Sequence, residues 1–157
     1  MPETDYTMLR AQMLALLANE PDALANASNF VALLFQALED INWLGLYVLR
    51  GDDLVLGPFH GLPACVRIPL GKGVCGAAAA SRATLRIDDV HEFPGHIVCD
   101  AASRSELVVP LLVSDKLIGV LDIDSPSVGR FSAADQAGVE MICAAYCELQ
   151  GARPGFI

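Results

Sequence analysis

Five cysteines, none of them in a CxxC pair, are the side chains of this 157-residue chain most able to do redox or nucleophilic chemistry. Cys65, Cys75 and Cys99 lie in or beside segments predicted to be irregular, where functional residues tend to collect. Cys143 and Cys147 lie four residues apart in a segment with helical periodicity, a spacing that suits a disulfide poorly. Core packing is the expected role of Cys143, which leaves the first three cysteines as candidates.

The surroundings of Cys75 and Cys99 leave two interpretations open for each thiol. Cys75 follows Gly73 near the start of a predicted short helix, where backbone amides could stabilise a thiolate. A small residue needed by a tight turn explains Cys75 equally well. Cys99 lies in the polar loop stretch 95–100, a setting more typical of reactive cysteines than a helix interior, although the neighbouring Asp100 disfavours a thiolate.

A cluster of carboxylates is the second candidate for chemistry. Asp122 and Asp124 are two residues apart in an apolar strand and therefore share one face of it. Glu106 begins the partner strand of a predicted hairpin, which brings it to their level within one residue of register. Three acids so close should raise at least one pKa and suit an ammonium group, a metal ion or a proton donor. As an alternative, Asp124 could only cap the turn at 125–126, but this does not explain why three acids cluster.

Aromatic and histidine side chains supply the remaining candidates for a ligand site. Trp43 and Tyr47 share a strand face with a glycine between them, so they either wall a pocket or fill an aromatic core. His91 and His96 have a permitted metal-ligand spacing with Cys99, but no further pair completes a tetrahedral set. The sequence therefore predicts neither a metal nor another cofactor.

The elements that must position these residues follow from the hydrophobic periodicity. Helices are predicted at residues 4–17, at 28–40 and from Ser132, where Ser132 and Asp135 resemble a capping box. Two hairpins are predicted, one pairing residues 43–49 with 54–59 and the other pairing 106–113 with 117–124. A short helix is predicted after the glycines at 71–76, and a long loop at 88–104. This order predicts an α+β fold, with a central antiparallel sheet and the N- and C-terminal helices packed on one of its faces.

The composition, with 54% hydrophobic and 18% charged residues, predicts one ordered domain. A net charge of -9 repels nucleic acid and anionic membranes, and no run approaches the roughly 18 apolar residues of a membrane span. The start of the chain lacks the basic and apolar pattern of a signal peptide. We therefore expect a cytoplasmic protein, no nucleic acid or membrane partner, and thiols that are reduced by default.

Several segments together carry a family resemblance. They are Ala64-Cys-Val-Arg-Ile-Pro, Gly71-Lys-Gly-Val-Cys-Gly76, Asp89-Val-His, Gly95-His-Ile-Val-Cys-Asp-Ala-Ala-Ser103, Ser105-Glu106 and Gly119-Val-Leu-Asp-Ile-Asp-Ser125. These segments resemble the free methionine-(R)-sulfoxide reductases, which are built on a GAF domain. The resemblance runs from about Trp43 to the last helix, and ordinary GAF sensor domains are not expected to combine these cysteines and acids. It implies that residues 1–157 form a single GAF-type domain.

The resemblance implies thiol-dependent reduction of free L-methionine (R)-S-oxide to L-methionine. Cys99 would attack the sulfoxide sulfur and become a sulfenic acid, Cys65 would be the resolving cysteine, and Cys75 would be a possible second resolving cysteine. An intramolecular disulfide would follow, which a thioredoxin-type reductant would reduce. The (R) configuration of the substrate rests on the resemblance alone.

The other implied roles concern the substrate pocket and the assembly. Glu106, Asp122 and Asp124 would bind and polarise the substrate, while Trp43 and Tyr47 would line its pocket. The family tends to form homodimers and is connected with oxidative stress. The residue types fit this chemistry, because sulfoxide reduction needs a thiolate, an acid that protonates the departing oxygen, and a second thiol.

A non-enzymatic binding or sensor module and a metal-binding protein are the alternative classes of function. A non-enzymatic GAF module could bind a small ligand or sense oxidants through the same cysteines, but a sensor needs an output domain or partner surface, and we expect no fused domain in this chain. A metal-binding protein is disfavoured by the incomplete ligand set. Formation of methionine from its sulfoxide distinguishes the enzyme from both.

Overall fold

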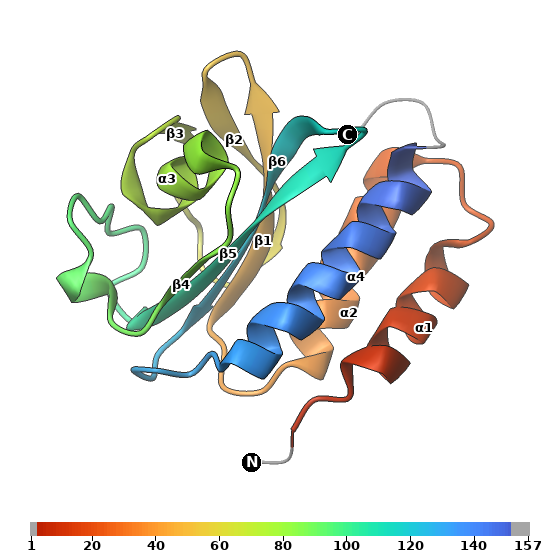
Figure 1. Ribbon diagram of the computed structural model, residues 1–157, viewed down its shortest axis with the longest axis horizontal. Coiled ribbons are helices and arrows are strands. Elements are labelled where there is room, and N and C mark those ends of the chain that lie inside the picture. Colours follow the sequence, from red (N-terminus) through yellow and green to blue (C-terminus); the bar gives the residue numbers. More distant parts are fainter. Residues whose placement is uncertain (1–2, 152–157) are drawn as a thin grey trace.

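A six-stranded antiparallel sheet forms the centre of the computed structural model, which describes residues 3–151 (Figure 1). The strands pair in the order β3-β2-β1-β6-β5-β4. Their bounds are β1 (Trp43–Arg50), β2 (Asp53–His60), β3 (Arg67–Pro69), β4 (Leu85–Ile87), β5 (Ser105–Val113) and β6 (Lys116–Ser125). The predicted α+β class and antiparallel sheet are confirmed, while residues 1–2 and 152–157 of the predicted domain lie outside the described residues.

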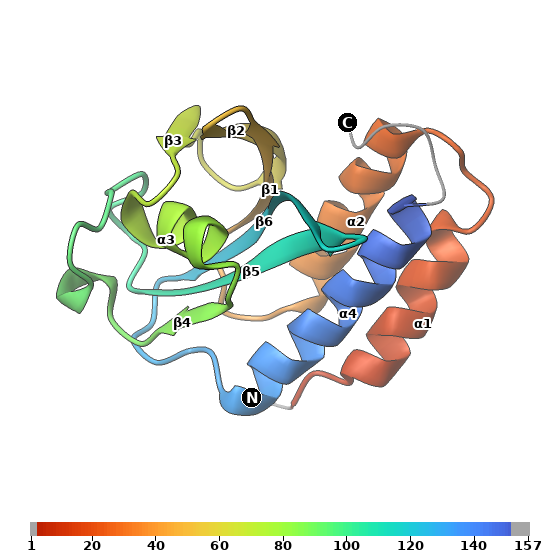
Figure 2. The same cartoon turned by 45° about the horizontal axis from the view of Figure 1, so that its top comes forward.

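Helices cover the two faces of the sheet unequally (Figures 1 and 2). On the face that carries the N- and C-terminal helices, as predicted, α2 (Ala23–Ala37) and α4 (Ala133–Gly151) pack against the sheet, and α1 (Tyr6–Leu17) packs against these two helices. The other face carries only the short α3 (Gly73–Ser81), with the 3-10 helix η1 (Val90–Glu92) in the long loop beside it. None of the helices within residues 3–151 is long and apolar enough to cross a membrane.

Two hydrophobic cores lie on opposite faces of the sheet, because successive side chains of a strand point to opposite faces. In β6, Leu121 and Ile123 pack into the core beneath α1, α2 and α4. Val120 belongs to the core beneath α3, and Asp122 and Asp124 follow it on that face at two-residue spacing. The acidic residues therefore lie on the face with less helical cover, where room for a ligand remains.

The boundaries predicted for α2 are wrong at both ends. The helix begins at Ala23, because the side chain of Asp22 accepts a hydrogen bond from the backbone N–H of Ala25 at 2.8 Å and caps the first turn. It ends at Ala37, because Leu38 is extended and Asp40 has a positive φ of 53°. The sequence pattern missed this start because residues 23–27 contribute few large apolar side chains.

The capping box predicted for the last helix is confirmed. The backbone N–H of Asp135 donates to Ser132 Oγ at 3.0 Å, and the backbone N–H of Ser132 donates to the Asp135 carboxylate at 2.9 Å. Two strands escaped prediction, β3 and β4, which have three residues each and are too short for alternation to show. Of these, β3 matters for the site because it follows directly on the segment that carries Cys65.

Candidate active site

The three carboxylates predicted to cluster do share one face of the sheet. Asp124 lies opposite Glu106 on β5 and opposite Trp43 on β1, so these three side chains form one row across three strands. Asp122 lies one row away, opposite Gly45. The pairing settles the register that the sequence left open by one residue, and Glu106 lies directly across from Asp124.

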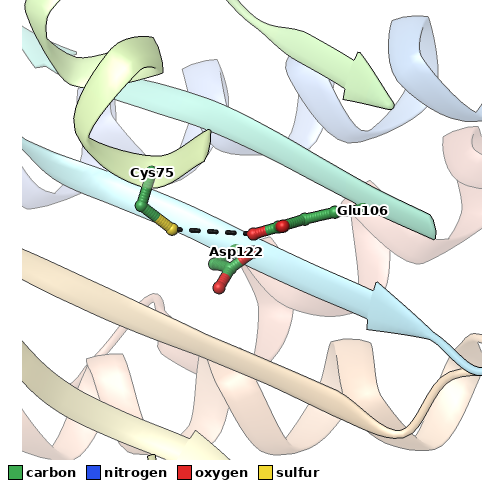
Figure 3. Close-up of side chains that lie close together, drawn as sticks. All are labelled: Cys75, Glu106 and Asp122. Carbon is green, nitrogen blue, oxygen red and sulfur yellow. Dashed lines mark hydrogen bonds between the residues drawn. The ribbon is translucent and has the colours of Figure 1, made fainter. Parts of the chain in front are cut away.

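A thiol completes this cluster from above the sheet. Cys75, in the first turn of α3, lies over the acids, and its Sγ donates a hydrogen bond to Glu106 Oε2 at 3.8 Å (Figure 3). Asp122 approaches the same point from β6. Cys75, Glu106 and Asp122 are only 4%, 5% and 6% exposed, and Asp122 Oδ1 has no hydrogen-bond partner among the described residues. This buried oxygen lines the pocket and is free to accept a hydrogen bond from a ligand.

Burial dominates the electrostatics of the cluster. Burial, and then the charges of Asp122 and Asp124, raise the pKa of Glu106 well above its usual range. The pKa of Asp124 is raised well above normal by burial and then by Asp122, and the pKa of Asp122 is raised by burial. The expectation that the close acids would raise at least one pKa is confirmed in direction for Glu106 and Asp124.

The same environment disfavours one of the two interpretations of Cys75, a thiolate stabilised by helix amides. Burial, followed by the charges of Asp122 and Glu106, raises the pKa of the Cys75 thiol well above its ordinary value. Near neutral pH the group is therefore a protonated thiol that donates to Glu106 rather than a thiolate held by helix amides.

A disulfide joins Cys65 and Cys99 across 34 residues of sequence, with a Cα–Cα distance of 5.5 Å. Both half-cystines are partly buried, whereas Cys75, Cys143 and Cys147 are buried free thiols. The pair lies beside the acidic cluster, because Cys99 and all three carboxylates line one pocket. Two cysteines whose cooperation only the family resemblance implied are thus bonded to each other.

The aromatic residues hold the segment that carries Cys65. Trp43 Nε1 donates to the carbonyl oxygen of Leu62 at 3.1 Å, and the Tyr47 hydroxyl donates to the carbonyl oxygen of Cys65 at 2.9 Å. Both rings are almost fully buried and also line the pocket. Trp43 and Tyr47 therefore belong both to the hydrophobic core and to the wall of the pocket, so both interpretations of the pair hold.

A glycine makes room for the aromatic wall. A Cβ atom at Gly45 would lie 2.5 Å from Phe59 Cβ and 2.6 Å from Trp43 Cη2, closer than real Cβ atoms approach other heavy atoms. The Trp43 ring therefore lies over Gly45, stacked against Phe59 with ring centroids 5.3 Å apart. The glycine gap seen in the sequence is what allows this ring position.

One pocket gathers most of the residues that the sequence singled out. It is lined by Trp43, Tyr47, Cys75, Cys99, Glu106, Asp122 and Asp124. Cys65, the remaining predicted site residue, is joined to this set through its disulfide. His96 also lines the pocket, and no histidine belongs to the potential metal-binding group found among the described residues, which consists of Cys75, Glu106 and Asp122.

Sequence reasoning missed the residues that anchor the loop of Cys99. Asn42 Nδ2 donates to the Asp100 carboxylate at 3.0 Å and to Ser103 Oγ at 3.1 Å. Ile97 packs within 3.1 Å of the position a Cβ would take at Gly73, the first residue of α3. The only sequence signal for Asn42 was its place directly before a strand that carries candidate pocket residues.

Comparisons with known proteins agree on one family. Residues 9–146 match the family model described as GAF domain. The chain is 54% identical over 139 residues to the free methionine-R-sulfoxide reductase of Escherichia coli (strain K12), a match that covers 88% of this chain and 84% of that protein. It is 43% identical over 124 residues to the enzyme of the same name from Saccharomyces cerevisiae, covering 76% of this chain and 69% of that protein.

A solved structure leads to the same assignment. The fRMsr of Staphylococcus aureus in complex with its substrate superimposes with a TM-score of 0.90 at 48% identity, covering 95% of this chain and 97% of that chain. Identity and coverage of this extent go beyond a shared fold, and the disulfide and buried acids described above are the groups that thiol-dependent chemistry needs. The chain therefore belongs to the free methionine-R-sulfoxide reductases, oxidoreductases built on the GAF domain.

Proposed function

We propose that this protein reduces free L-methionine (R)-S-oxide to L-methionine, with Cys99 as the nucleophile. The observation that carries the proposal is a Cys65–Cys99 disulfide beside a pocket that contains three clustered carboxylates. A disulfide is the product expected when a sulfenic acid on one cysteine condenses with a second thiol. Relatives that share about half of the sequence carry the name of this activity.

The reaction divides into two balanced steps. The Cys99 thiolate attacks the sulfoxide sulfur, the S–O bond breaks as oxygen passes to Cys99 with proton donation from an acid, and methionine leaves. The Cys65 thiol then attacks the sulfenic sulfur of Cys99, which forms the disulfide and releases water. The 5.5 Å Cα–Cα distance supports the second step, because it lies within the range that a disulfide spans.

The carboxylates divide the remaining tasks in this proposal. Glu106 is our candidate for the proton donor, because burial and two neighbouring acids keep its pKa high. Asp122 Oδ1, buried and without a partner, would accept a hydrogen bond from the ammonium group of a free amino acid. Asp124 adds a further carboxyl group on the same strand face, and the Trp43 and Tyr47 rings offer an apolar wall to the methyl group of the substrate.

A substrate comparison tests the proposal. The purified protein with dithiothreitol is given each epimer of free methionine sulfoxide and a peptide with an internal methionine sulfoxide. We expect methionine from the free (R) epimer and at least about a hundredfold less product from the peptide, whose amide nitrogen carries no charge to pair with the buried acids. If the (R) epimer gives no methionine, or if the peptide reacts as fast, the proposal is wrong.

The two candidate resolving cysteines differ in their surroundings. We propose Cys65 for this role, and its bond to Cys99 supports the choice. Cys75 as a second resolving cysteine stays a prediction: its thiol lines the same pocket as Cys99, but its raised pKa slows thiolate attack. Homodimerisation, a cytoplasmic location and a domain that spans residues 1–157 also stay predictions.

A thioredoxin-type protein is the proposed source of electrons, and exposed apolar residues flank the disulfide where it would dock. Leu62, Val66 and Val98 are each 63% exposed, and the two valines directly adjoin Cys65 and Cys99. Large apolar side chains this exposed beside a reducible bond favour a protein partner. The reductant thiolate would attack one sulfur of the disulfide, and the other would leave as a thiolate.

Substitution of a flanking valine tests this surface. We expect Val66→Asp to slow turnover driven by thioredoxin about tenfold, because a charge replaces an apolar contact, while turnover driven by dithiothreitol stays unchanged. Leu24→Asp is the matched control, since Leu24 is similarly exposed and belongs to α2, which packs on the other face of the sheet. Equal losses with both reductants, or equal losses in both variants, would rule out docking at this surface.

A further inference from the structure

One buried thiol of the pocket, that of Cys75, has no role in the first turnover of the proposed reaction. Cys75 is a free thiol that is 4% exposed, and the disulfide is complete without it. Its Sγ and one oxygen each of Glu106 and Asp122 all lie within 4.8 Å of one another (Figure 3). Binding an ammonium group does not require sulfur at this place, because a thiol is a weak acceptor.

This donor set is suited to a thiophilic cation. A thiolate and two carboxylates are ligands that Zn²⁺ takes, and a tetrahedral ion with ordinary Zn–S and Zn–O bonds would separate sulfur from oxygen by about 3.6 Å. The distance from Cys75 Sγ to Glu106 Oε2 is 3.8 Å, so the two atoms require little movement. Hard cations such as Mg²⁺ and Ca²⁺ prefer sites of oxygen alone, and sulfur selects against them.

A second observation indicates that the cluster lacks a positive partner. Asp122 Oδ1 is buried and has no hydrogen-bond partner among the described residues. The ion pairs found within residues 3–151, Arg67–Asp53 and Arg130–Asp135, do not include Asp122 or Glu106. An ionised carboxylate is costly to bury, and a bound divalent ion would stabilise the ionised form of these acids. The pocket reaches all three side chains and provides the open side for a fourth ligand such as water.

We propose that Cys75, Glu106 and Asp122 form a binding site for Zn²⁺ or a similar thiophilic divalent cation, which competes with the substrate for the pocket. Cys75 loses its proton when the sulfur–metal bond forms, so binding releases at least one proton and weakens at low pH. The claim that the cation competes with the substrate rests on the proposed function, which assigns Glu106 and Asp122 to substrate binding. The claim that the cation binds rests on the cluster alone.

Cadmium binding to the oxidised protein tests the site directly. In the disulfide form Cys65 and Cys99 cannot ligate, so a thiolate-to-cadmium charge-transfer band reports on the remaining thiols. We expect one Cd²⁺ per chain, displaced by Zn²⁺, with the band lost in Cys75→Ser and the affinity lowered at least about tenfold in Asp122→Asn. Cys143→Ala and Cys147→Ala are the matched controls, since both thiols are also free and buried but belong to α4, in the core on the other face of the sheet, and they should keep the band.

The outcomes separate this proposal from the proposed function. Retention of the band in Cys75→Ser, or its loss only in the Cys143 and Cys147 variants, would overturn the site. Free methionine sulfoxide should raise the apparent Kd for Cd²⁺ on the oxidised protein, and an unchanged Kd would overturn the competition. Because the oxidised form is measured without turnover, failure to reduce the sulfoxide would leave the metal result standing, and the reverse also holds.

Discussion

Cys99→Ser is expected to lower the rate of methionine formation from the free sulfoxide by at least about a thousandfold, because a serine hydroxyl cannot accept the oxygen as a sulfenic acid. The loss should be the same with dithiothreitol and with thioredoxin, because both reductants act after the step that is blocked. Initial rates over a range of substrate concentrations provide the measurement. Binding of the sulfoxide, followed by calorimetry, should persist, since the acids and aromatic rings of the pocket remain.

Cys143→Ala is the control for this substitution. Cys143 is a buried residue of α4, which packs on the opposite face of the sheet from the pocket, so its loss should reduce stability and leave activity per folded molecule unchanged. If Cys99→Ser kept most of the activity while Cys75→Ser or Cys65→Ser lost the first turnover, the nucleophile would have to be reassigned.

Glu106→Gln is expected to have the second-largest effect, a loss of about a hundredfold to ten-thousandfold in kcat, because the amide cannot supply the proton. The raised pKa of Glu106 also gives a direction for the pH dependence. A group that must be protonated loses function as the pH rises through its pKa, so the wild-type rate should fall on the alkaline side. The residual rate of Glu106→Gln should lack this decline, as a pH–rate profile would show.

The same substitution should stabilise the fold at alkaline pH. A carboxyl whose pKa is raised in the folded state binds its proton more tightly than in the unfolded chain, so stability falls as the pH rises above the ordinary pKa of Glu. Each unit of upward pKa shift that the substitution removes contributes about 1.4 kcal/mol. Urea unfolding at pH 8 measures the effect, and Glu140→Gln on the exposed side of α4 is the control expected to change neither activity nor stability. Full activity in Glu106→Gln would transfer the proton donor role to another acid, with Asp124 the next to test.

Strand alternation was enough to predict the acidic cluster. Asp122 and Asp124 share a face in any regular strand, and the turn between β5 and β6 sets Glu106 beside them. That turn has two residues with positive φ, Ser114 at 50° and Asp115 at 64°, the geometry of a tight hairpin. Local rules therefore determine the face and most of the register.

The relation between the cysteines could not be predicted in the same way. Cys65 and Cys99 are brought together by long-range contacts, such as the hydrogen bond from Tyr47 to the Cys65 carbonyl and the anchoring of Asp100 by Asn42. Such contacts leave no periodic signal in a loop, and only the family resemblance implied which cysteines cooperate. The state of Cys75 was also out of reach, because its pKa is raised first by burial and then by acids on two other elements, neither of which the sequence around Cys75 shows.

The most direct test of the account is a single turnover of the reduced Cys65→Ser variant with one equivalent of free methionine (R)-sulfoxide and no other reductant. Methionine is quantified, and the state of each cysteine is read by mass spectrometry of the intact protein and its peptides. The account predicts about one methionine per chain, with Cys99 oxidised either to a sulfenic acid or to a disulfide with Cys75. Release of methionine while Cys99 stays a free thiol would contradict it.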